Sequence, residues 1–279
     1  MDAPQGARSR RAVLQILPAS SPTNDTARVS DSTSSLDRYE LEPDACESDL
    51  DSSAHRWREP MRSNASRKPS EAPRNAARPT IVAARDRRVI LCESGLEGKA
   101  ALVLMARSDC ATIYEQPPAV RYVDHLGKAR RHHFDFLMLL NSGRRIAVAV
   151  KPHSIATKHN LECLLKLIAR QMDTSFADGV CLLTDAKMPP FLVANAELIH
   201  DARRISDHRT DGCIRKVAAA LHGAATLDWI IGAAGIEGDD QAFYAAARAI
   251  GDGILVPTRR GVIDRGMTVR SANAAERTP

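Results

Sequence analysis

Apolar and polar residues change their spacing several times along this chain, and each change predicts a different element. Between residues 94 and 107 the apolar residues Leu96, Ala100, Val103 and Leu104 follow a period of about 3.6, which is typical of a helix. Ser94 stands where an N-cap is expected, and Glu97 follows three residues later, which is the spacing of a capping box. We therefore predict a helix over 94–107 that is capped by Ser94.

The next hundred residues alternate between short apolar runs and longer amphipathic ones. The short runs predict strands over 111–115, 119–124, 130–140, 145–151 and 179–184. The longer runs predict helices over 157–172 and 191–204. A meander of strands, a crossover helix and a further strand together predict one mixed α/β domain over 80–206.

A different pattern begins near residue 207. It predicts helices over 213–222, 226–234 and 239–250, a strand over 254–257 and a return strand over 262–270. Two helices joined by a turn and followed by a hairpin are the layout of a winged helix-turn-helix. We therefore predict a small winged-helix-like α+β domain over 207–279.

The first 79 residues show no sustained period. They contain 13 serines and 8 of the 15 prolines, and few large aliphatic residues. Such a stretch cannot bury enough apolar surface to offset its chain entropy. We predict a disordered leader over 1–79.

Composition and charge narrow the class of protein. No apolar run approaches 18 residues, so no transmembrane helix and no membrane partner are expected. The six cysteines are scattered and form no CxxC pair, which favours a reducing cytoplasm over a disulfide scaffold or a zinc ribbon. The net charge of +5 permits a nucleic-acid partner without requiring one.

Two charged residues stand out because they interrupt apolar strands. Asp135 lies within the predicted strand 130–140, and Lys151 ends the strand 145–151. If the turn between these strands centres on Gly143, a plain antiparallel pairing places Asp135 opposite Lys151. The pair alone is equally compatible with an ordinary cross-strand ion pair.

Adding a glutamate from the preceding helix, Glu97, produces the layout of restriction-endonuclease-like nucleases. Phosphodiester hydrolysis in such a site uses Mg²⁺, which Mn²⁺ can replace, to neutralise the phosphate and activate water. Magnesium prefers hard oxygen ligands, here Asp135, Glu97 and the carbonyl of Val150. Lys151 would orient the water and stabilise the developing charge.

Four short motifs occur in order along this part of the chain. They are Glu93-Ser94-Gly95-Leu96-Glu97, Glu115-Gln116-Pro117, His132-His133-Phe134-Asp135-Phe136 and Val150-Lys151. In order and spacing this set resembles the N-terminal domain of the TnsA-type transposon endonucleases. The resemblance covers roughly residues 88–204.

The resemblance implies a restriction-endonuclease-like mixed sheet flanked by helices, followed by a winged-helix-like domain. It implies cleavage of the 5′ strands at transposon ends, with a DDE-type transposase subunit and an AAA+ ATPase regulator as partners. By the motif match, Glu97 and Asp135 are metal ligands and Lys151 is the catalytic lysine. The implied location is the cytoplasm, on the nucleoid when the complex is assembled on DNA.

One position departs from the superfamily pattern. A glutamate or glutamine is usual two residues before the lysine, and this chain has Ala149, whose side chain cannot bind a metal. The alternative is therefore a non-catalytic DNA-binding or regulatory protein that retains the nuclease-like scaffold and binds through its winged helix.

Arginines in the second domain are the candidate DNA contacts. Arg248 lies on the predicted recognition helix, and Arg259, Arg260 and Arg265 lie on the predicted wing. The acidic start of the same helix, Asp239-Asp240, would repel phosphate, so contact with the ATPase or transposase is the other interpretation.

Overall fold

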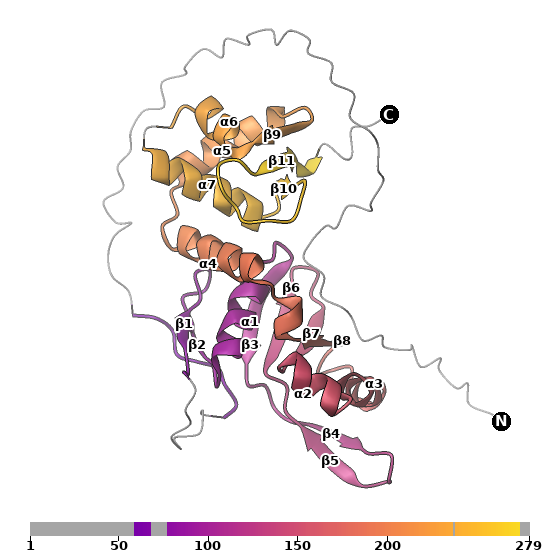
Figure 1. Cartoon of the computed structure of the whole chain (residues 1–279). Coiled ribbons are helices and arrows are strands. Elements are labelled where there is room, and N and C mark those ends of the chain that lie inside the picture. The colour runs from indigo at the N-terminus through magenta and orange to yellow at the C-terminus, as the bar shows by residue number, and fades with distance from the viewer. Residues whose placement is uncertain (1–58, 68–76, 237, 274–279) are drawn as a thin grey trace, which may run out of the picture. The chain divides into compact units, whose positions relative to one another are not determined.

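The computed structural model describes residues 59–67, 77–236 and 238–273, and residues 60–273 belong to one compact unit. This part of the chain is a mixed α/β structure with seven α-helices (Figure 1). Of the predicted leader, only residues 59–67 and 77–79 fall within the described ranges, and the rest lies outside them.

A four-stranded sheet forms the centre of the N-terminal half. Its strands are β3 (Cys110–Glu115), β6 (Phe136–Leu140), β7 (Arg145–Val150) and β8 (Gly179–Leu183), in the order β3-β6-β7-β8. The pairs β3–β6 and β6–β7 are antiparallel, and β8 runs parallel to β7. A parallel neighbour requires a crossover connection, and two helices provide it.

Helices lie on both faces of this sheet. The predicted first helix is confirmed as α1 (Gly95–Ala106), with Ser94 as its N-cap. The predicted crossover helix over 157–172 is wrong in its start, because the chain forms α2 (His153–Lys158) and then α3 (Leu161–Gln171). Asn160 separates them in the left-handed conformation, with a φ of 46° that ends the regular helix.

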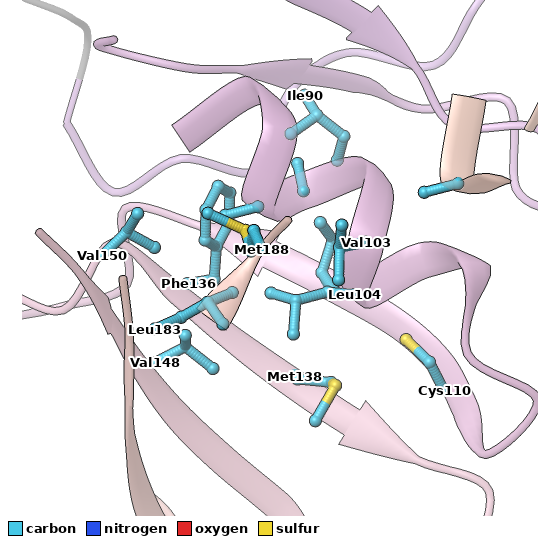
Figure 2. Close-up of a cluster of buried hydrophobic side chains, with 14 of the residues drawn as sticks. Ile90, Val103, Leu104, Cys110, Phe136, Met138, Val148, Val150, Leu183 and Met188 are labelled. Atoms are coloured by element: carbon cyan, nitrogen blue, oxygen red, sulfur yellow. The ribbon is translucent and has the colours of Figure 1, made fainter. Parts of the chain in front are cut away.

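Alternation along the strands gives the sheet two apolar faces. Phe136, Val148 and Leu183 face α1, where they pack with Val103 and Leu104 (Figure 2). The intervening residues pack against α3 on the opposite face, and these include Ala147, Ala149, Val180 and Leu182. Because both faces are covered, β7 and β8 are continuous apolar runs, as expected for doubly buried strands.

Two hairpins stand apart from the main sheet. One is β1 (Thr80–Val82) with β2 (Val89–Leu91), which the periodicity did not predict. The other is β4 (Val120–Val123) with β5 (Ala129–His132). The prediction of one strand over 130–140 is therefore wrong, since β5 and β6 are separate strands in different sheets.

The C-terminal part combines helices with a small sheet. Helix α4 (Pro190–Arg204) leads into it after a short 3-10 turn, Asp185–Lys187. The elements that follow are α5 (His208–Ala220), β9 (Ala224–Thr226), α6 (Leu227–Ala233), α7 (Asp239–Gly251), β10 (Leu255–Pro257) and β11 (Thr268–Ser271). The three strands form an antiparallel sheet in the order β10-β11-β9. Strand β9 was missed by the sequence pattern, which is weak because the strand is only three residues, Ala-Ala-Thr.

Helix α4 contacts both halves. Its Ile199 joins the core cluster formed by α5, α6 and α7. Its Arg203 donates to the Met105 carbonyl of α1 at 2.7 Å and to the Gly251 carbonyl of α7 at 2.6 Å. The predicted domain boundary at 206/207 therefore lies just after α4, a helix that packs against elements of both predicted domains. The boundary itself stays a prediction.

Among the described residues, no helix combines the length and apolar character that a membrane crossing requires. Five cysteines of the same ranges are free thiols.

Candidate active site

The turn between β6 and β7 sets the register at the candidate site. Its loop residues are Asn141, Ser142 and Gly143, with Gly143 at a φ of 81°. Leu140 N–H donates to the Arg144 carbonyl at 2.8 Å, so the hairpin centres on Ser142. This three-residue loop with a left-handed glycine is a common hairpin connection.

The predicted register is consequently wrong by two residues. Phe136 pairs with Val148, and extending this pairing places Asp135 opposite Ala149. Asp135 also precedes β6 instead of lying inside a strand, and Lys151 follows the last residue of β7. The long lysine side chain nevertheless spans the offset, and its Nζ lies 3.3 Å from Asp135 Oδ2.

Asp135 is fixed by hydrogen bonds at the end of the sheet where β6 begins and β7 ends. Its N–H donates to the Val148 carbonyl at 3.0 Å, and its carbonyl accepts from Gln116 N–H at 2.9 Å. Its Oδ2 accepts from Val150 N–H at 2.7 Å. The carboxylate therefore has a fixed orientation, with Oδ1 contacted only by Lys151 within the described residues.

Burial has the largest effect on the pKa of the Asp135 carboxyl group. Asp135 is 5% exposed, and burial raises its pKa above the usual range, against the lowering effects of Lys151 and Val150 N–H. The negative charge of Glu93 raises the pKa further. The ammonium of Lys151 is different, because 39% of that side chain is exposed and it can meet a molecule from solvent.

Glu97 closes the predicted capping box. Its N–H donates to Ser94 Oγ at 3.2 Å, while its Oε2 accepts from Glu93 N–H at 2.8 Å and its Oε1 accepts from Ser94 Oγ–H at 3.1 Å. The residue is 6% exposed, and burial raises its pKa, with a further contribution from the charge of Asp135. Glu97 thus has a structural role and lies within electrostatic range of Asp135.

The side chains of Asp135 and Glu97 can be compared with the ligands that a divalent cation requires. Asp135 and Glu97 are buried acids, and the charge of Asp135 raises the pKa of Glu97, which is a repulsion that a bound cation would relieve. Carboxylate oxygens are the ligands that Mg²⁺ prefers. The two side chains therefore fit a magnesium ion in chemistry, although the described residues contain no group of three His, Cys, Asp or Glu arranged to hold a metal.

The remaining predicted positions have clear surroundings. Val150, expected to offer its carbonyl, supplies its N–H to Asp135. Ala149 is 2% exposed and packs in the core cluster beside α3. The position two residues before Lys151 is therefore part of the apolar core in this protein.

Three polar residues join the site without having been assigned to it. Arg67 pairs with Glu93, Nη1 to Oε1 at 3.0 Å, and donates to Gln116 Oε1 at 2.6 Å. Gln116 is 1% exposed, and its Nε2 has no hydrogen-bond partner within the described residues. Glu93 and Gln116 lie in the recognised motifs, whereas Arg67 comes from the serine- and proline-rich segment, where no pattern marks it.

His132, at the end of β5, is largely buried, and this changes its pKa. Burial lowers its pKa to about 4, and the charges of Lys151 and His133 act in the same direction. Its Nε2 is buried without a partner within the described residues, and its ring lies edge-on to Phe134 at 4.7 Å. The neutral imidazole is therefore the form that the fold accommodates.

We expect this histidine to make stability depend on pH. Its folded pKa lies below the unfolded value near 6.5, so its contribution is complete above pH 6.5 and is lost as the pH falls towards 4. Between pH 7.5 and 5 the wild type should lose roughly 1–2 kcal/mol more unfolding free energy than His132→Gln. Urea unfolding at the two pH values measures this. Asp135 and Glu97 contribute with the opposite sign in both proteins, and equal losses would contradict the assignment.

The structure corrects the DNA-contact prediction for Arg248. This side chain is 5% exposed, and its Nε donates to Asp211 Oδ1 at 2.7 Å. Its Nη1 donates to the carbonyls of Ala202 and Ile205 at 2.9 and 2.8 Å. Arg248 thus ties α7 to the end of α4 and to α5, and no surface is left for a phosphate.

The other three arginines lie between β10 and β11. Arg259 and Arg260 are exposed in this loop. Arg265 pairs with Asp228 of α6 at 3.2 Å, with 36% of its side chain exposed. Their contact with DNA stays a prediction, and Arg265 would have to exchange a carboxylate for a phosphate.

No family model matches this chain, and no curated protein sequence matches it. The resemblance to the TnsA-type endonucleases therefore depends on the ordered motifs of the sequence alone.

Proposed function

We propose that this chain is a Mg²⁺-dependent DNA endonuclease of the TnsA type, which cuts the 5′ strands at transposon ends. In this proposal it acts in the cytoplasm, on nucleoid DNA, with a DDE-type transposase and an AAA+ ATPase. The observation that carries the proposal is the position of Lys151 Nζ, 3.3 Å from a buried, oriented Asp135 carboxylate at the edge of a mixed sheet.

Asp135, Glu97 and Lys151 have different roles in the proposed reaction. Asp135 and Glu97 would hold the ion, which would neutralise charge at the phosphate and make a bound water more acidic. Lys151 presents its exposed ammonium to the phosphate, where it stabilises negative charge that develops during cleavage. The hydrogen bond from Val150 N–H keeps the Asp135 carboxylate in one orientation throughout.

The proposal extends to the fold. A helix, an antiparallel meander, a crossover and a parallel strand support a restriction-endonuclease-like domain. Three helices closed by a small antiparallel sheet support a winged-helix-like domain after residue 207.

A labelled transposon-end duplex, incubated with Mg²⁺ or Mn²⁺ and the proposed DDE-type transposase partner, tests the function. We expect 5′-strand nicks from the wild-type chain and none from Lys151→Ala, since the variant lacks the ammonium at the phosphate. Nicking by the variant at the wild-type rate would refute the assignment of Lys151.

The second candidate is a non-catalytic DNA-binding or regulatory protein. The burial of Ala149 in the core favours it, because no side chain from that position reaches the site. Absence of nicks from the wild-type chain, in a mixture where it still binds DNA or the transposase, would support this candidate.

A further inference from the structure

The β4–β5 hairpin is a two-stranded ribbon that extends away from the main sheet (Figure 1). Its tip is a hydrogen-bonded turn, because Asp124 Oδ1 accepts from the N–H groups of Leu126 and Lys128, both at 2.9 Å. Gly127, at a φ of 75°, makes the tight turn possible. The ribbon is therefore an ordered element and not a loose loop.

One face of the ribbon is attached to the body of the protein. Val120 is buried and Tyr122 is partly buried in the core cluster beside α3. The Gln171 side chain of α3 accepts from Val123 N–H at 2.8 Å and donates to its carbonyl at 2.9 Å. Only the opposite face is free to receive a partner.

That free face carries like charges in direct opposition. Arg121 and Arg131 are cross-strand partners, and both are exposed. Neither guanidinium has a hydrogen bond or an ion pair within the described part of the chain. Like charges placed opposite each other destabilise a two-stranded sheet. A cost of this kind is relieved when an anion lies across both side chains.

The ribbon as a whole is positively charged, as is its exposed face. Between residues 119 and 133 there are four lysines and arginines and a single acid, Asp124. That acid is already occupied, since its Oδ2 accepts from Arg130 Nε at 3.0 Å. The net field of the ribbon is therefore positive.

The ribbon begins and ends at the candidate active site. Its first strand follows Gln116, whose N–H donates to the Asp135 carbonyl, and its second strand leads directly to Asp135. His132 at its base is close enough to Lys151 for that charge to lower its pKa. A molecule lying along the ribbon would reach the candidate catalytic residues at its base.

We propose that the β4–β5 ribbon docks on duplex DNA through Arg121 and Arg131. A two-stranded ribbon fits the major groove, which is about 12 Å wide, and opposed arginines can each contact a phosphate. The inference rests on the proposed nuclease function for its choice of DNA as the partner, and it names a substrate-binding surface outside the winged-helix-like part.

Fluorescence anisotropy of a labelled DNA duplex with the full chain tests the proposal, in EDTA so that no cleavage occurs. The variant is Arg121→Ala/Arg131→Ala. The matched control is Arg215→Ala/Lys216→Ala, which likewise removes two exposed positive charges, here from α5. A second variant, Arg121→Lys/Arg131→Lys, retains the charge and is expected to keep most of the binding.

We expect the alanine variant to bind about 10-fold or more weakly at 100 mM salt, and the control to bind like the wild type. Two lost phosphate contacts should also reduce the slope of log K against log salt by about 2. Binding equal to that of the control would overturn the proposal, as would tighter wild-type binding to an RNA duplex through the same arginines. Thermal unfolding of each variant identifies a loss that comes from misfolding.

The DNA-binding test of the ribbon and the nicking test of the proposed function can fail independently. Should Lys151→Ala nick DNA normally while the ribbon variant loses binding, the catalytic assignment fails and the docking surface stands. Should Lys151→Ala stop nicking while the ribbon variant binds like the control, the docking surface fails alone.

Discussion

Asp135→Asn is expected to abolish nicking while leaving the fold close to its wild-type stability. The substitution keeps the size of the side chain and removes its charge, so a cation loses a ligand and the electrostatic contribution to the transition state disappears. We expect a loss of about 10²–10³-fold or more in nicking rate, which is the range for removing one preorganised electrostatic contact.

Stability should change little, because two effects oppose each other. The neutral amide loses the 3.3 Å contact with Lys151, which is partly exposed and therefore contributes little. In return, the protein no longer buries a charge whose pKa is raised by burial and by the charge of Glu93. We expect the free energy of unfolding to change by about 1 kcal/mol or less.

Asp178→Asn is a suitable control for this experiment. Asp178 Oδ2 accepts from the backbone N–H of Arg145 at 2.7 Å, which is the same type of contact that Asp135 makes with Val150. The control should nick DNA at the wild-type rate. If Asp135→Asn destabilised the protein and still nicked DNA, Asp135 would be a structural ion-pair partner and the proposed function would lose its central residue.

Arg88→Met is expected to cause the largest loss of stability. Arg88 and Glu115 are 3% and 1% exposed, and Arg88 Nη1 lies 2.8 Å from Glu115 Oε2. The guanidinium also contacts the Ile113 carbonyl and lies over the Tyr114 ring at 5.2 Å. Removing it leaves a buried carboxylate without its cation, which costs about 3–5 kcal/mol.

A double variant distinguishes charge burial from packing. Arg88→Met/Glu115→Gln contains no unpaired buried charge, so it should recover much of the loss, and urea unfolding of all three proteins measures the coupling. The Ser63 hydroxyl, which donates to Glu115 Oε1 at 2.5 Å, can donate equally to the glutamine oxygen. A loss below about 1 kcal/mol for Arg88→Met would mean that water reaches Glu115.

The Arg88–Glu115 pair also explains part of the second motif. Glu115 lies in Glu115-Gln116-Pro117, and its partner Arg88 comes immediately before β2, a strand that the periodicity did not predict. Gln116 adopts a φ of 46° and places its N–H on the Asp135 carbonyl. The motif is therefore a structural support that connects β2 and β3 to the candidate site.

Local patterns in the sequence were sufficient for the elements that local interactions stabilise. The capping box of Ser94 and Glu97 involves residues three apart, and α1 forms where that spacing predicted it. The apolar runs predicted strands at β7 and β8, and the structure explains why the runs are continuous, because a strand with both faces covered has no polar side. The proximity of Asp135 and Lys151 was also predictable, since a short turn joins their strands.

Only the tertiary structure determined which strands pair and which charged side chains become buried, because both depend on the elements that pack nearby. The run 130–140 was predicted as one strand, yet its first part pairs with β4 in a separate ribbon and its second part pairs with β3 and β7. Arg248 has the sequence context of a surface arginine, but the end of α4 supplies carbonyls that bury it. Arg67 meets Glu93 from 26 residues away, and no local period encodes such a distance. Periodicity reports the environment of each position along one element, whereas these contacts depend on how separate elements pack.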